Sequence, residues 1–135
     1  MRLALIALLS FLPVMPGDDY EAVEFRTLSD FDWTKGMELP AEVKKFDGKK
    51  VAISGFIRTE DGSSEGIAEF WLVDQGCDCE GWPKMNEVIS CMMPDGEVIS
   101  NDDSPITVRG TLEVGEIIED GYVVSIYRLK VDTVE

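Results

Sequence analysis

The side chains best suited to chemistry lie in one short segment of this chain. The sequence has three cysteines, and Cys77, Cys79 and Cys91 all fall within it. The 135 residues include no histidine. Histidine is the most frequent general base and the commonest metal ligand in proteins. We therefore expect a domain that binds something and does not catalyse a reaction, with the cysteine segment as its candidate site.

A structural disulfide is the first interpretation of these cysteines. Cys91 can pair with Cys77 or with Cys79, which closes a loop of about 13 to 15 residues and contributes roughly 3 kcal/mol in the chain-entropy model. Small exported domains often carry such a cross-link because their hydrophobic core is limited. This interpretation predicts one free thiol and a loop that is held in place to bind a partner.

A soft-metal site is the alternative interpretation. A Cys-x-Cys pair with a third thiolate, here Cys77, Cys79 and Cys91, suits copper(I) or zinc, and thioethers such as that of Met85 are further possible ligands. Tetrahedral zinc sites usually need a fourth cysteine or histidine, which this segment lacks. We therefore expect no cofactor under the first interpretation and copper or zinc under the second.

Four residues in and beside this segment are candidate binding residues. Trp82, Pro83 and Asn86 follow the first two cysteines, and Trp71 precedes them in an apolar run. Exposed tryptophans are frequent hot spots at binding interfaces. Trp71 belongs to an expected strand and should be at least half buried. The expected ligand is an unknown protein or a small molecule.

The first 17 residues have the pattern of a secretory signal peptide. Arg2 supplies a positive charge, Leu3–Leu12 is almost wholly apolar, and Pro13 ends the run. Such a run is shorter than the roughly 20 residues that span a bilayer. We expect cleavage near residue 17, export to the periplasm or the medium, and no stable membrane insertion afterwards.

The net charge narrows the class of partner. The chain has 12 basic and 27 acidic residues, a formal net charge of −15. Phosphate backbones are bound through lysine and arginine, so this balance argues against nucleic acid as a partner. The charge also favours a soluble protein that is a monomer or associates weakly.

The remainder of the chain has the pattern of a β-protein. Five segments alternate apolar and polar residues or are rich in β-formers: Val51–Ile57, Ala68–Asp74, Glu87–Met93, Ile106–Val114 and Tyr122–Val131. Glycines inside strands, here Gly55 and Gly110, are typical of bulges and bends in coiled strands. Arg109 and Arg128 lie in strands and should form ion pairs on the sheet surface.

These features predict an all-β domain with little helix, an OB-like barrel of five to six strands. We assign residues 1–17 to the signal peptide, 18–37 to an N-terminal arm and 38–135 to the barrel. A short helix is expected at Pro40–Phe46, since proline is favoured in the first turn.

The order of several short motifs resembles that of a known family. The motifs are Leu39–Pro40, Phe46–Lys49, Gly55–Ile57, Phe70–Val73, the cysteine-proline-asparagine loop, Gly110–Leu112 and Tyr127–Leu129. The family consists of exported bacterial proteins of unknown function with small OB-like β-barrels. The resemblance covers roughly Pro40 to Val134, and one departure is Asp78, which separates two cysteines that are adjacent in the family. It implies the fold and export and gives no reaction.

Overall fold

The computed structural model of the chain describes residues 19–75 and 83–135, and the predicted signal peptide lies outside these residues. The described elements are β1 (Glu21–Ala22), α1 (Phe25–Ser29), α2 (Ala41–Lys44), β2 (Lys50–Arg58), β3 (Glu69–Val73), the 3-10 helix η2 (Met85–Glu87), β4 (Val88–Met92), β5 (Ile106–Glu119) and β6 (Tyr122–Val134). The prediction of an all-β fold with little helix is confirmed.

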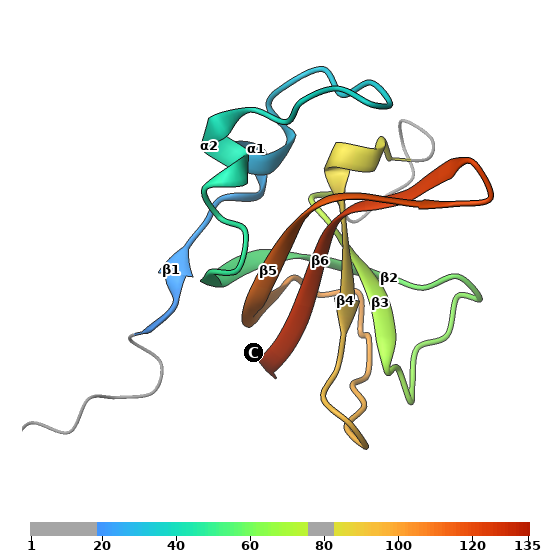
Figure 1. Cartoon of the computed structure of the whole chain (residues 1–135). Coiled ribbons are helices and arrows are strands. Elements are labelled where there is room, and N and C mark those ends of the chain that lie inside the picture. Colours follow the sequence, from blue (N-terminus) through green and yellow to red (C-terminus); the bar gives the residue numbers. More distant parts are fainter. Residues whose placement is uncertain (1–18, 76–82) are drawn as a thin grey trace, which may run out of the picture.

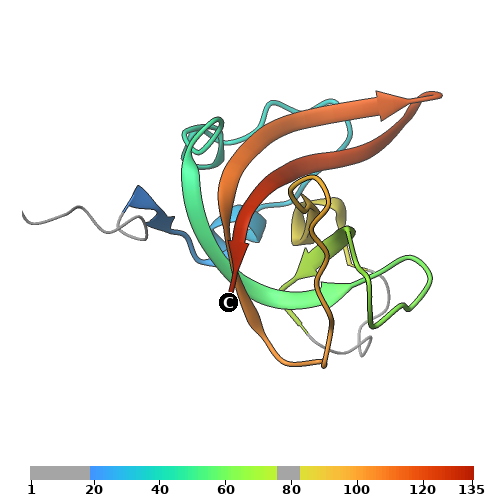
Figure 2. The same ribbon diagram turned by 90° about the horizontal axis from the view of Figure 1, so that it is seen from below.

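The six strands form one sheet in the order β1-β2-β3-β4-β6-β5. β2 pairs antiparallel with β3 through its second half and with β5 through its first half. The pairings of β2, β3, β4, β6 and β5 therefore return to β2. Figure 2 shows β2, β5 and β6 as strongly curved strands. The OB-like assignment of this arrangement stays a prediction.

The alternation of the strands determines which side chains form the core. Val51, Ile53 and Ile57 lie on one face of β2 as predicted, and all three are buried. Val108 and Leu112 are the buried residues of the matching face of β5. The burial of these apolar side chains is the main force that stabilises the fold.

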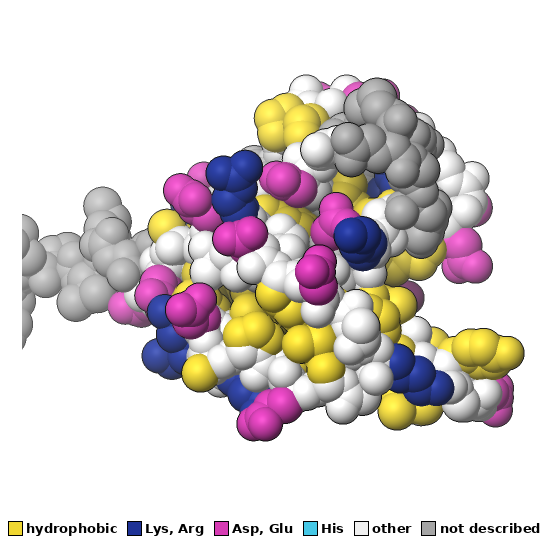
Figure 3. Space-filling view, turned by 90° about the horizontal axis from the view of Figure 1, so that it is seen from above, with side chains coloured by type: hydrophobic (Ala, Val, Ile, Leu, Met, Phe, Trp, Pro, Cys, Tyr) yellow, Lys and Arg dark blue, Asp and Glu magenta, His cyan; other side chains and the backbone are white. Residues whose placement is uncertain are grey.

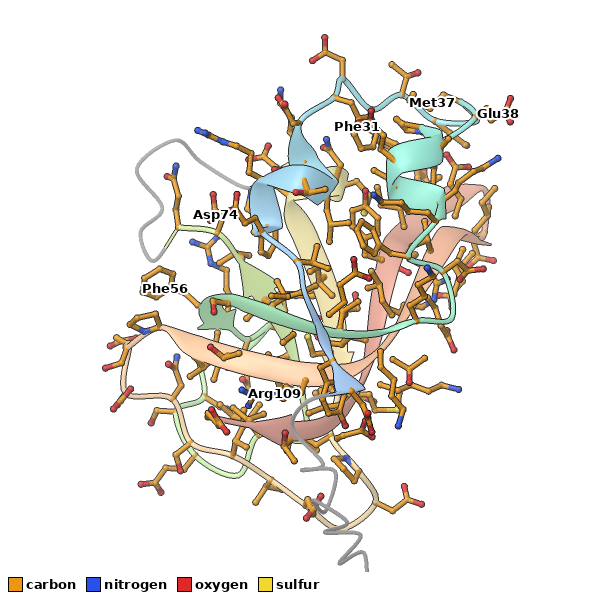
Figure 4. All side chains as sticks on the ribbon, turned by 90° about the vertical axis from the view of Figure 1, so that its left-hand side faces the viewer. Phe31, Met37, Glu38, Phe56, Asp74 and Arg109 are labelled. Carbon is orange, nitrogen blue, oxygen red and sulfur yellow. The ribbon has the colours of Figure 1, made fainter. Side chains whose placement is uncertain are left out.

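The N-terminal arm completes this core. Phe25 and Leu28 of α1 are buried in the same hydrophobic cluster as the strands, and so are Val43 and Phe46 at α2. Figure 1 shows α1 and α2 together at one end of the strands. Figure 4 shows Phe31, which packs against the core, near the same end. The arm is thus part of the packed domain.

A buried hydrogen bond joins the arm to the sheet. The hydroxyl of Tyr127, a fully buried residue of β6, donates to the carbonyl oxygen of Leu28 at 2.6 Å. Burial raises the pKa of the Tyr127 phenol, so it stays protonated and remains a donor.

Replacing Tyr127 with phenylalanine should lower the free energy of unfolding by about 1–3 kcal/mol, because a buried carbonyl loses its donor. Urea denaturation followed by circular dichroism measures this change. Tyr122→Phe is the matched control, since Tyr122 is 75% exposed and should tolerate the change. Equal stability of the two variants would show that this bond does not hold the arm.

Both predicted surface arginines form ion pairs. Arg109 of β5 lies 2.8 Å from the carboxylate of Glu135, and Arg128 of β6 lies 3.4 Å from that of Glu113. Figure 4 shows Arg109 along β5 and Asp74 where the chain leaves β3. The pair between Arg128 and Glu113 belongs to the site described next.

Candidate ligand-binding groove

Strand register brings five polar or aromatic side chains into one row across the outer face of the sheet. Arg58 pairs with Trp71, Trp71 with Ser90, Ser90 with Arg128, and Arg128 with Glu113. Each of the five is partly exposed. Cross-strand neighbours lie about 4.5–5.5 Å apart, so the row is a continuous strip of side chains.

A hollow lies over this row. Its volume is about 430 Å³, within the range of roughly 300–1,000 Å³ that is typical of ligand pockets. Its lining comes from all five strands of the ring: Arg58, Glu60, Glu69, Phe70, Trp71, Ser90, Cys91, Met92, Glu113, Ile117, Glu119, Val124, Ser125, Arg128, Leu129 and Lys130. We call this hollow the groove.

A smaller apolar hollow adjoins the groove. It has a volume of about 140 Å³ and is lined by Arg58, Trp71, Val73, Pro83, Met85, Val88 and Val124. Three of these residues, Arg58, Trp71 and Val124, also line the groove. The structure therefore brings together two of the predicted binding residues, Trp71 and Pro83. Trp82 lies outside the described residues.

A network of polar contacts fixes Arg128 and Lys130, the two cationic residues that form one wall of the groove. The Nη1 atom of Arg128 donates to the carbonyl oxygen of Gly115 at 2.9 Å and to the hydroxyl of Ser125 at 3.0 Å. The carboxylate of Glu113 lies 3.4 Å from Arg128 Nε and 3.2 Å from Lys130 Nζ. This wall is preorganised, and Glu113 offsets much of its positive charge.

The acidic residues of the groove are less engaged. Glu60, Glu69 and Glu119 line it and are exposed. None of the three forms an ion pair with a residue that the structure describes. Because Glu113 already faces Arg128 and Lys130, the carboxylates left over at this surface are available to a cationic ligand.

Apolar side chains extend from the groove along the β5–β6 hairpin. Ile117, Ile118, Tyr122 and Val124 are 37% to 75% exposed. Figure 1 shows the hairpin projecting from the body of the molecule, and Figure 3 shows hydrophobic side chains at its end, at the lower right. Ile117 and Val124 also line the groove. Exposed apolar patches on a protein surface often mark interaction sites.

Asn86 lies elsewhere and holds two segments together. Its side chain is 1% exposed, and its Nδ2 atom donates to the carbonyl oxygens of Ser29 at 3.1 Å and Phe31 at 2.7 Å. Its Oδ1 atom is buried without a hydrogen-bond partner among the described residues. Asn86 thus satisfies carbonyls at the end of α1. That it also binds a ligand stays a prediction.

Cys91 is a free thiol in the structure, so the predicted disulfide from Cys91 to Cys77 or Cys79 is not seen. The side chain is 3% exposed and belongs to the hydrophobic core, and its Sγ lies 3.7 Å from the carbonyl oxygen of Ile89. Cys91 faces inward because it alternates with Ser90 and Met92. Cys77 and Cys79 lie outside the described residues.

Burial also disfavours the deprotonated, thiolate form of Cys91. It raises the pKa of the thiol well above its ordinary range, and only the deprotonated form binds soft metals strongly. Residues 19–75 and 83–135 contain no group of three or more histidine, cysteine, aspartate or glutamate side chains placed to hold a metal ion. None of the helices in those ranges is long and apolar enough to cross a membrane.

We expect Cys91 to resist alkylation in the native protein and to react fully once the chain is unfolded. Iodoacetamide labelling without reductant, followed by peptide mass spectrometry, measures both states. The expected result is unmodified Cys91 natively and complete modification in denaturant. A Cys91 peptide linked to the peptide of Cys77 or Cys79 would overturn the assignment of Cys91 as a core residue.

Comparison with known proteins identifies the family. The model for the family described as "Protein of unknown function (DUF3299)" matches residues 19–135. The chain belongs to this family. The resemblance inferred from the sequence motifs, to a bacterial family of unknown function, is therefore confirmed.

A solved structure supports the same fold. The crystal structure of the DUF3299 family protein PA4066 from Pseudomonas aeruginosa PAO1 aligns at a TM-score of 0.55 and 20% identity, covering 85% of this chain and 94% of that chain. A protein assigned as an aspartyl-tRNA synthetase from Leishmania major Friedlin aligns at a TM-score of 0.44 and 13% identity, over 97% of this chain and 22% of that one. No curated protein matches the chain.

Sequence reasoning found Trp71 and Pro83 and missed most of the groove. Arg58, Ser90 and Arg128 join Trp71 only through strand register, which the sequence does not display. The available signal was partial: each of these residues lies at a polar position of an alternating strand, opposite the core face. Alternation gives the face of each strand but not its neighbours.

Proposed function

We propose that this DUF3299 family member is an exported, non-catalytic binding domain, and that its groove holds a segment of a partner protein. The observation that carries the proposal is the groove over the row from Arg58 to Glu113, with Trp71 between its charged residues. A half-buried tryptophan beside fixed charges is a frequent arrangement at binding hot spots.

The surroundings of the groove favour a protein over a small polar ligand. Ile117 and Val124 continue the groove into the exposed apolar hairpin, so a partner can cover both surfaces at once. Protein interfaces typically combine an apolar centre with a polar rim. The net charge of −15 also disfavours nucleic acid, a common ligand of OB folds.

The sequence supports the location and the lack of catalysis. The pattern of residues 1–17 favours export, and the absence of histidine removes the commonest general base. The buried Cys91 contributes to the core beneath the groove, so we assign it no cross-linking role. Binding is thus proposed to depend on Trp71 and the groove wall and to need no sulfur chemistry.

Selection from a phage-displayed peptide library tests this function. Selected peptides should bind the wild-type protein, and Trp71→Ala should weaken them by about tenfold or more. Val98→Ala is the matched control, because Val98 is 58% exposed and does not line the groove. Thermal unfolding verifies that both variants are folded. Peptides that bind Trp71→Ala and the wild type equally would contradict the proposal.

A further inference from the structure

One edge of the β5–β6 hairpin is open where it borders the groove. β4 and β6 pair only between Ser90–Met92 and Arg128–Lys130, although β6 begins at Tyr122. From Tyr122 to Ile126, β5 is the only strand that pairs with β6 among the described residues. Ser125 and Ile126 are buried, so the accessible part of this edge is Tyr122–Val124, whose outward backbone groups have no strand partner in the part of the chain that the structure describes. An open edge of this kind is a template for an added strand.

The open edge of β6 borders the smaller hollow, which lies between β6 and the start of β4. Val124 of β6 lines both hollows, and Met85 of η2 and Val88, the first residue of β4, line the smaller one. The smaller hollow thus lies where β4 and β6 diverge before they pair at Ser90 and Arg128. An extended segment in this space would meet the β6 backbone on one side and apolar side chains below it.

The charges at this place favour a cationic segment. Glu119 lies at the end of β5, and Glu60 and Glu69 line the groove, all without an ion pair to a described residue. A net charge of −15 on each copy also repels a second copy of this chain. A partner with lysine and arginine side chains would avoid this repulsion and form ion pairs with the carboxylates that line the groove.

We propose that the partner segment adds as a β-strand to the edge of β6 at Tyr122–Val124, and that it carries apolar residues together with lysine or arginine on the face turned toward the groove. This inference rests on the proposed function, since it names the binding mode and the partner chemistry of the same groove. Main-chain hydrogen bonds would supply affinity, and the alternating side chains would supply specificity. Because successive side chains of a strand point to opposite faces, the apolar side chains that enter the two hollows and the basic ones that reach Glu60, Glu69 and Glu119 would share one face of the segment.

Three matched peptides of about six residues, a common strand length, test whether the partner binds by strand addition. In the first, valine and lysine take turns on the face that would turn toward the groove, and threonine occupies the other face. The second has glutamate in place of lysine, and the third is the lysine peptide with alternate backbone amides methylated. Affinity is measured by calorimetry, and the contact site by amide chemical shifts of the labelled protein. The lysine peptide should bind best and shift the amides of Tyr122–Val124. The other two should each bind about tenfold more weakly or worse.

Charge variants separate this site from general attraction to an acidic protein. Replacing Glu60, Glu69 and Glu119 with glutamine should weaken the lysine peptide by about tenfold. The control replaces three exposed acids outside the groove, Glu42, Glu65 and Glu97, and should change affinity less than about twofold. Equal losses in the two triple variants would overturn the assignment of a cationic partner to this groove.

The outcomes also distinguish this inference from the proposed function. Equal binding of the methylated peptide would overturn strand addition, and equal binding of the glutamate peptide would overturn the partner chemistry. Self-association that shifts the amides of Tyr122–Val124 would identify a second copy as the occupant and overturn the cationic partner. In each case the groove remains a binding site if library-selected peptides still depend on Trp71. The proposed function fails only if those peptides do not.

Discussion

The Gly110→Ala variant is expected to lose more than about 3 kcal/mol of its free energy of unfolding, a large share of the roughly 5–15 kcal/mol of a typical domain. A β-carbon at Gly110 would lie 2.1 Å from the carbonyl oxygen of Lys130 and 3.0 Å from the Cα of Val131. These are backbone atoms of β6 and cannot rotate away. Relief requires that β5 and β6 separate where they pair.

The position of Gly110 explains the size of this effect. A register shift between β5 and β6 occurs at Arg109/Gly110, and Gly110 also pairs with Val51 of β2. The residue is therefore enclosed by strands on both sides. Strain at this point would disturb the two pairings that close the ring of strands.

Urea denaturation of Gly110→Ala and Gly96→Ala measures the effect against a matched control. Gly96 has a positive φ of 80°, but a β-carbon there would meet nothing within 4 Å. Its replacement should therefore cost only about 1 kcal/mol of backbone strain. Similar losses of stability in both variants would show that β5 and β6 can separate at Gly110 at little cost. That result would contradict the close pairing of these two strands.

Filling the groove should weaken binding strongly without unfolding the domain. In Ser90→Trp the new side chain would start from the middle of the row, between Trp71 and Arg128, and occupy the hollow of about 430 Å³. Ser90 is half-buried on the outer face of β4, so the core is left intact. We expect the affinity for library-selected peptides to fall by at least about 30-fold, or ~2 kcal/mol.

Fluorescence polarisation with labelled peptides measures this loss, and thermal unfolding verifies the fold. Ser100→Trp adds the same side chain at an exposed position that does not line the groove. It should leave the affinity unchanged within about twofold. Undiminished binding to a folded Ser90→Trp protein would place the peptide site elsewhere.

Much of the fold could be predicted from the sequence because the strands carry strong local signals. The alternation in Val51–Ile57 gave the buried face of β2, and Asp120–Gly121 gave the turn before β6. β5 continues to Glu119, beyond the predicted end at Val114. The prediction stopped early because the hairpin exposes Ile117 and Ile118, which breaks the alternation of a half-buried strand.

The site was harder to predict, for two physical reasons. The three cysteines are close in sequence, which suggested a common role, whereas the inward alternation of Ile89 and Cys91 assigns Cys91 to the core. The groove instead joins residues from distant strands, such as Arg58 and Arg128. Their proximity depends on register and on the curvature of the sheet, which no local pattern encodes.

Mapping the bound peptide on the protein tests the central claim most directly. The claim is that a partner segment occupies the groove on the outer face of β3, β4 and β6. Amide and indole chemical shifts of isotope-labelled protein are recorded with and without a library-selected peptide. The account predicts that the largest changes occur at Trp71, Ser90 and Val124. Changes confined to the arm around Phe25–Ser29, with the groove unaffected, would contradict it.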